Sequence, residues 1–76
     1  MSTLGQQIRK ARIDQRLTQK ALVTKTGLSQ KYLSQIELDK VDPRASIVVR
    51  LAVALRVPTD YLLRGEMEQT AVQEGR

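Results

Sequence analysis

Residues 30–37 combine two faces of a short helix. The apolar positions Tyr32, Leu33 and Ile36 are spaced to pack inward. The outward stripe carries polar, hydrogen-bonding side chains, namely Gln30, Lys31, Ser34 and Gln35. A glutamine amide can bond both polar atoms of an adenine edge, and a lysine can reach guanine or a phosphate. Glutamine is also common on solvated helix faces, so the stripe favours base recognition but leaves a plain exposed surface open.

This stripe lies in the second of two short helical patterns that meet at Gly27. The first pattern covers residues 18–26, with Thr18 as its predicted cap, and the second covers about 29–38, with Ser29 as its cap. Glycine ends the first pattern at a position where a positive φ costs little. Helix, tight turn and helix is the layout of a DNA-reading helix-turn-helix.

Three further helices are predicted at about 3–15, 45–55 and 59–63 from their apolar stripes and start signals. No alternating strand pattern, internal repeat or second domain is visible. We therefore predict an all-α fold in one domain over residues 1–65, followed by a short polar, flexible tail at 66–76. A core of this size is marginal, so the helices must pack well or a dimer must help.

The composition excludes several classes of site. The 76 residues contain no cysteine and no histidine, so disulfides, Cys/His zinc sites and nucleophilic sites based on His or Cys are excluded. The eight acidic residues are scattered without ligand spacing. We predict no catalytic residue, no enzyme activity, no metal, no cofactor and no small-molecule ligand.

The charge balance points to an anionic partner. Thirteen Lys and Arg against eight Asp and Glu give a net charge of +5, which suits a polyanion, although a soluble lysine-biased surface would give the same balance. The chain has no apolar run of signal-peptide or membrane-span length. The prediction is a cytoplasmic, nucleoid-associated protein, encoded by a bacterium or a phage.

The sequence resembles the Cro and lambdoid-repressor type of helix-turn-helix domain, the XRE family, over residues 4–65. The motifs that carry the resemblance occur in the family's order and spacing: Ile8-Arg9, Arg12, Leu17-Thr18-Gln19, Leu22, Gly27, Leu28-Ser29, Tyr32 to Glu37, Lys40, Pro43, Leu51-Ala52, Ala54-Leu55, Val57-Pro58 and Asp60 to Leu63. The resemblance implies a compact five-helix bundle that binds operator DNA. Its helices 2 and 3 form the motif, and helix 3 enters the major groove.

The resemblance also implies individual roles. Gln30, Lys31 and Gln35 match base-reading positions, and Ser34 matches a position close to the DNA. Phosphate contacts are expected from five residues, Gln19, Arg9, Lys10, Lys40 and Arg44, with Arg9 and Lys10 as alternatives to each other.

Arg12 and Glu37 match a buried ion pair that links helix 1 to helix 3. The residues support this pair independently, because Glu37 follows the core residue Ile36 and needs a cation; two ordinary surface charges are the alternative. Asp39 stands where the family commonly has glycine, so we expect a positive φ there.

A homodimer is predicted, because one recognition helix buries too little surface for tight, specific binding. Dimer symmetry then predicts an inverted repeat with half-site centres about 10 bp, or roughly 34 Å, apart. The predicted dimer surface is Tyr61, Leu62, Leu63 and Val53; alternatively, these residues only close the monomer core.

Several biological settings fit such a domain. It could serve as a phage or mobile-element repressor, as the controller of a restriction-modification system, or as an autoregulating antitoxin. The alternative from another class is an antitoxin-like protein-interaction module that binds a protein partner with or without DNA. Activation or repression depends on operator position, which the sequence does not encode.

Overall fold

The computed structural model describes residues 2–63 and contains only helices and loops over that range. The helices are α1 (Leu4–Asp14), α2 (Gln19–Thr26), α3 (Gln30–Glu37) and α4 (Ala45–Leu55), and a further helical segment occupies 59–63. The all-α prediction is confirmed, and each predicted helix lies within one residue or so of its expected bounds. The predicted domain end at 65 and the tail at 66–76 lie outside the described residues.

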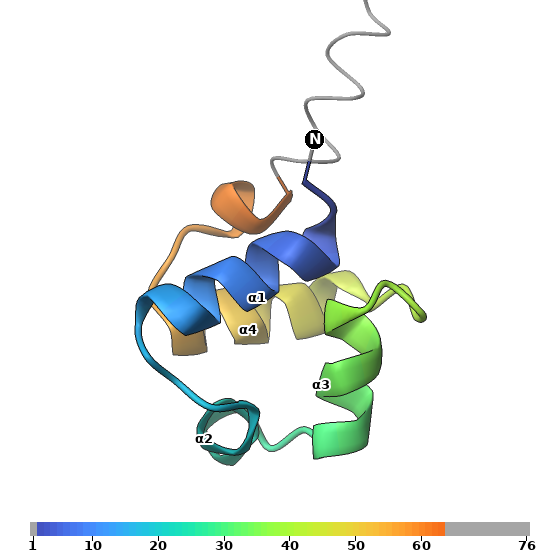
Figure 1. The fold of residues 1–76 in the computed structure, drawn as a ribbon. Coiled ribbons are helices and arrows are strands. Elements are labelled where there is room, and N and C mark those ends of the chain that lie inside the picture. The colour runs from blue at the N-terminus through green and yellow to red at the C-terminus, as the bar shows by residue number, and fades with distance from the viewer. Residues whose placement is uncertain (1, 64–76) are drawn as a thin grey trace, which may run out of the picture.

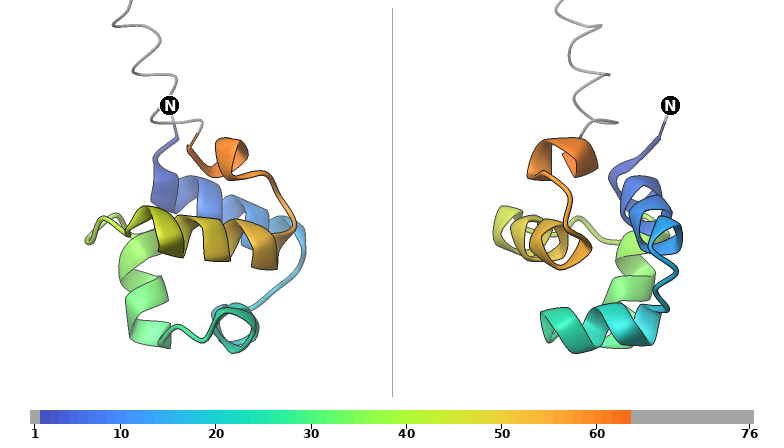
Figure 2. Two further views of the ribbon diagram at one scale, coloured as in Figure 1. Left: turned by 180° about the vertical axis from the view of Figure 1, so that it is seen from behind. Right: turned by 90° about the vertical axis from the view of Figure 1, so that its left-hand side faces the viewer.

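The helices form a bundle around one aliphatic core. The helices α1 and α4 lie side by side, the segment 59–63 covers one side of that pair, and α2 and α3 lie on the opposite side (Figures 1 and 2). The core residues are Leu4, Ile8, Ala11, Leu22, Leu33, Ile36, Val48, Leu51, Ala52, Leu55 and Leu62. Burial of such aliphatic side chains is the main stabilising term, at roughly 1.5–3 kcal/mol for each large one.

Three of the helices begin at a side-chain cap. The Thr3 hydroxyl accepts from the amide of Gln6, and the Gln6 side chain accepts in return from the Thr3 amide, which completes a capping box on α1. Thr18 caps α2 and Ser29 caps α3, each accepting a backbone N–H three residues later at 3.0 Å. These caps fix where the helices of the motif start.

The turn between α2 and α3 is set by Gly27. Its φ is +78°, and its amide donates to the Val23 carbonyl at 2.7 Å, which ends α2. Leu28 packs against the core in the corner that follows. Within residues 2–63, no helix is long and apolar enough to cross a membrane.

Candidate nucleic-acid interface

The predicted base-reading stripe lies on the solvent side of α3. Gln30 and Lys31 are exposed, and Ser34 and Gln35 are partly exposed. The opposite side of the helix is anchored, because Leu33 and Ile36 are fully buried. Within residues 2–63, none of the four polar side chains is hydrogen-bonded to protein. They are therefore available to an external partner from a backbone that the core holds in place.

The structure contains the predicted ion pair between Arg12 and Glu37, which joins α1 to α3. Arg12 Nε donates to Glu37 Oε2 at 2.7 Å, and Arg12 Nη2 donates to Glu37 Oε1 at 3.1 Å. Arg12 Nη1 also donates to the Leu17 carbonyl at 2.8 Å, between α1 and α2. Glu37 is only 5% exposed. The bidentate pair thus joins α1 to the last residue of α3.

A third donor reaches the same carboxylate. Gln19, the first residue of α2, donates from Nε2 to Glu37 Oε1 at 3.1 Å. All three helices of the candidate interface therefore meet at Glu37. Gln19 was predicted to contact a phosphate, and its bond to Glu37 was not predicted.

A hollow of about 510 Å³ opens over this network, lined by Gln6, Arg9, Arg12, Gln19, Ser34, Glu37, Leu38 and Asp39. It brings together three predicted DNA contacts from different helices, namely Arg9, Gln19 and Ser34. Gln6 and Leu38 were not predicted to lie here. Leu38 is an unusual lining residue, since it is apolar and 62% exposed.

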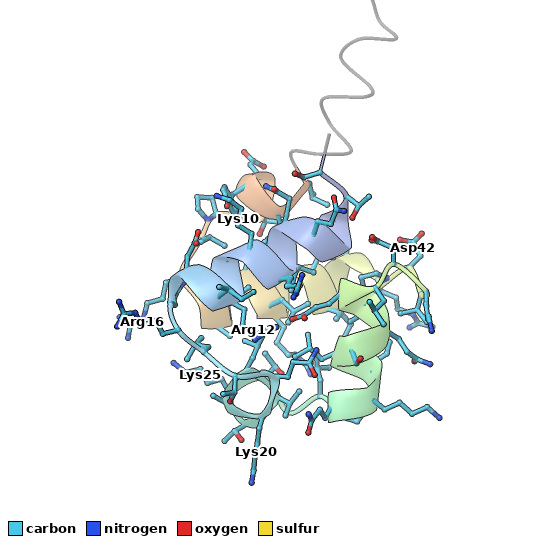
Figure 3. All side chains as sticks on the ribbon, in the orientation of Figure 1. Lys10, Arg12, Arg16, Lys20, Lys25 and Asp42 are labelled. Atoms are coloured by element: carbon cyan, nitrogen blue, oxygen red, sulfur yellow. The ribbon has the colours of Figure 1, made fainter. Side chains whose placement is uncertain are left out.

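The two cations proposed as alternatives on α1 are separated by the structure. Arg9 lines the hollow. Lys10 and Arg12 project from opposite sides of α1 (Figure 3), and Lys10 forms an exposed pair with Asp14 at 3.8 Å. Lys10 therefore lies away from the hollow, and Arg9 is the one of the two that lines it.

The loop after α3 carries Lys40 and Arg44, both exposed. Arg44 precedes α4 without a side-chain cap bond, as expected from the lack of a hydroxyl or carboxyl group there. Asp42 lies in the same loop, at one side of the molecule (Figure 3). Lys40 and Arg44 do not line the hollow.

Asp39 adopts the expected positive φ, at +60°, and has a role that the sequence did not reveal. Its carboxylate accepts from the Thr3 hydroxyl at 2.6 Å and from the Gly5 amide at 3.1 Å. A carboxylate at the start of α1 also suits the helix dipole. A glycine in the first turn of a helical pattern was the available signal, because glycine is unfavourable there unless another backbone approaches.

The residues predicted for a dimer surface divide into two groups. Leu62 is 0% exposed, so its assignment to a dimer surface is wrong, because its side chain fills the monomer core. Tyr61 and Leu63 are partly exposed, and Val53 is 72% exposed on α4. Of the four predicted residues, these three have exposed surface that is open to a second copy.

A family model described as a helix-turn-helix domain matches residues 5–68. This chain belongs to that helix-turn-helix family. The match includes α1 from its second residue and all of α2 to α4. The Cro and lambdoid-repressor type of fold expected from the resemblance is confirmed by the solved structures below.

Two phage proteins are similar in sequence to this helix-turn-helix chain. "Repressor protein C2" of Salmonella phage P22 is 35% identical over 69 residues, which cover 91% of this chain and 32% of that protein. "Immunity repressor protein" of Bacillus phage phi105 is 35% identical over 72 residues, which cover 95% of this chain and 48% of that protein. The chain therefore spans about a third of the first relative's length and about half of the second's.

Two solved structures share the fold. The P22 c2 repressor, crystallised in complex with a synthetic operator, superposes with a TM-score of 0.78 at 32% identity, covering 86% of this chain and 98% of that one. The restriction-modification controller protein C.AhdI from Aeromonas hydrophila gives a TM-score of 0.75 at 27% identity, covering 78% of this chain and 89% of that one.

Proposed function

We propose that this chain is a sequence-specific DNA-binding transcriptional regulator that binds an inverted-repeat operator as a homodimer. The observation that carries the proposal is the unpaired polar stripe of α3 beside a hollow lined by Arg9 and Gln19. In a major groove, Gln30, Lys31, Ser34 and Gln35 would face base edges. Arg9, Gln19, Lys40 and Arg44 would contact phosphates on either side and set the register.

The relatives support this proposal, since their names describe repressors and a restriction-modification controller. Both settings, a phage or mobile-element repressor and a restriction-modification controller, fit the domain. Selection of bound fragments from the source genome would separate them, because it gives the half-site, the spacing and the neighbouring genes. The expected spacing between half-site centres is about 10 bp.

Gel shifts at several salt concentrations test DNA binding, and variants of two adjacent cationic residues test the hollow. Arg9→Ala should weaken binding to all sequences and lower the slope of log affinity against log salt by about one, because one phosphate contact is lost. Lys10→Ala is the matched control, and it should leave the slope nearly unchanged. Equal effects of the two variants would show that the hollow is not a phosphate site.

The same assay separates the alternative function. An antitoxin-like protein-interaction module that does not use DNA predicts no salt-dependent shift of any genomic fragment by the wild-type protein. Cytoplasmic, nucleoid-associated localisation is part of the proposal and follows from DNA binding.

The proposed dimer surface combines Val53 and Val49 of α4 with Tyr61 and Leu63. Val49 and Leu63 also line an apolar hollow of about 240 Å³, together with Leu4, Asp42, Pro43, Ala45, Val48 and Thr59. An exposed apolar area of this kind is typical of an interface. Light scattering should show a dimer that Val53→Asp dissociates, whereas Ile13→Asp, at another exposed apolar residue, should not. A wild-type monomer bound to a single half-site would contradict the dimer.

A further inference from the structure

Gln19 has an orientation that its neighbours dictate. Its Nε2 donates to Glu37 Oε1 at 3.1 Å, and an ionised carboxylate can only accept hydrogen bonds. The nitrogen of the amide, and not its oxygen, must therefore face Glu37. Glu37 itself is fixed by the bidentate contact from Arg12, so the acceptor that holds Gln19 is rigid.

The amide of Gln19 retains unused bonding capacity. An amide nitrogen carries two N–H donors, of which one is directed to Glu37. Gln19 lines the hollow with Arg9 and Ser34, and its side chain is partly exposed. The second N–H is thus left for a partner that occupies the hollow.

We propose that Glu37 is a positioning residue for DNA binding, which acts by holding the Gln19 amide so that its second N–H donates to a backbone phosphate seated in the hollow. This inference rests on the proposed function. It assigns the buried ion pair a part in affinity as well as in folding. A side chain ordered before binding loses less conformational entropy when the complex forms.

Gln19 can be changed without stranding the buried charge. Arg12 donates to both oxygens of Glu37 on its own, so the ion pair persists when the third donor is removed. Gln19→Met keeps the length of the side chain and removes its donors. Gln19→Lys restores a donor that can reach both Glu37 and a phosphate, and so serves as the rescue variant.

The test is a double-mutant cycle of operator affinity with Gln19→Met, Glu37→Gln and their combination, each checked for folding by circular dichroism. We expect Gln19→Met to lose about 3- to 10-fold in affinity and Gln19→Lys to bind at least as well as wild type. Glu37→Gln should weaken binding, and the double variant should be no weaker than the weaker single variant. Independent, multiplying losses would overturn the proposal, as would wild-type affinity in Gln19→Met.

A second measurement covers the case in which Glu37→Gln does not fold. The side-chain amide of Gln19 in the free wild-type protein should give two well-separated proton resonances with slow solvent exchange, and one of them should shift on operator binding. Averaged, fast-exchanging resonances would contradict the held orientation. Failure of the wild-type protein to bind any DNA would instead reject the proposed function, because the amide measurement in the free protein needs no DNA.

Discussion

The two ends of α3 are held in different ways. At the C-terminal end, Glu37 accepts three hydrogen bonds from Arg12 and Gln19, and Asp39, just beyond the helix, accepts two from residues 3 and 5. At the N-terminal end, the contacts found within residues 2–63 are the Ser29 cap and core packing, and the Gln30 and Lys31 side chains are exposed.

This difference separates positioning from recognition. A helix fixed at one end by charged hydrogen bonds presents its other end at a defined place, while the side chains there stay free to bond a ligand. We call the C-terminal end of α3 the braced end and its N-terminal end the free end. Changes at the braced end should therefore mainly lower the stability of the fold, and changes at the free end should mainly lower DNA recognition.

Removing the cation of the braced end should have the largest effect on stability. Arg12→Ala leaves Glu37 buried without its bidentate partner, and we expect the free energy of unfolding to fall by about 3–5 kcal/mol. Chemical denaturation followed by circular dichroism measures this change. Lys10→Ala, on the same helix but in an exposed pair, should change it by roughly 1 kcal/mol or less. Similar losses in both variants would remove the distinction between buried and surface pairs.

The contact of α1 with the end of α3 should be next in size. A Cβ at Gly5 would lie 2.4 Å from the Ile36 carbonyl oxygen and 2.8 Å from that of Glu37. Both are backbone atoms that cannot swing aside, so Gly5→Ala should destabilise by about 1–3 kcal/mol. The comparison is Gly27→Ala, where the added Cβ would have no atom within 4 Å. This variant should lower the free energy of unfolding by about 1 kcal/mol through its positive φ alone. The denaturation midpoint of each variant decides the order, and a Gly5→Ala protein as stable as wild type would refute the close packing.

The smallest effect on stability is expected at the free end. Gln30→Ala removes an exposed side chain that has no hydrogen-bond partner within residues 2–63. The free energy of unfolding should therefore change by about 0.5 kcal/mol or less. Its effect should appear in operator selection, where discrimination at one base pair should relax by about 1–3 kcal/mol. A uniform loss over all sequences would assign Gln30 to the phosphate backbone instead of a base edge.

Local chemistry made most of the fold predictable. Thr18, Ser29 and Gly27 act within a few residues of themselves, so their hydrogen bonds and φ preference place the ends of α2 and α3 whatever surrounds them. The apolar spacing in each helix likewise identified the core side, because helical periodicity is a property of the chain itself. Leu62 was misassigned because three adjacent apolar residues give no periodic signal that tells which one faces inward.

The contacts between distant segments were not predictable in the same way. The Gln7 amide donates to the Tyr61 carbonyl at 2.9 Å, and the Gln15 amide bonds the Leu55 carbonyl. These glutamines look like ordinary helix surface residues in the sequence. Their partners are backbone atoms 54 and 40 positions away, which carry no side-chain signature.

The sequence by itself determined the helices, their caps, the turn at Gly27 and the polar stripe of α3, because each depends on residues close together in the chain. Only the tertiary structure decided that Arg9 and not Lys10 lines the hollow, that Leu62 fills the core, and that Gln19 shares the carboxylate of Glu37. Those outcomes depend on how α1, α2 and α3 pack against one another, since packing alone brings side chains from separate helices within hydrogen-bonding distance.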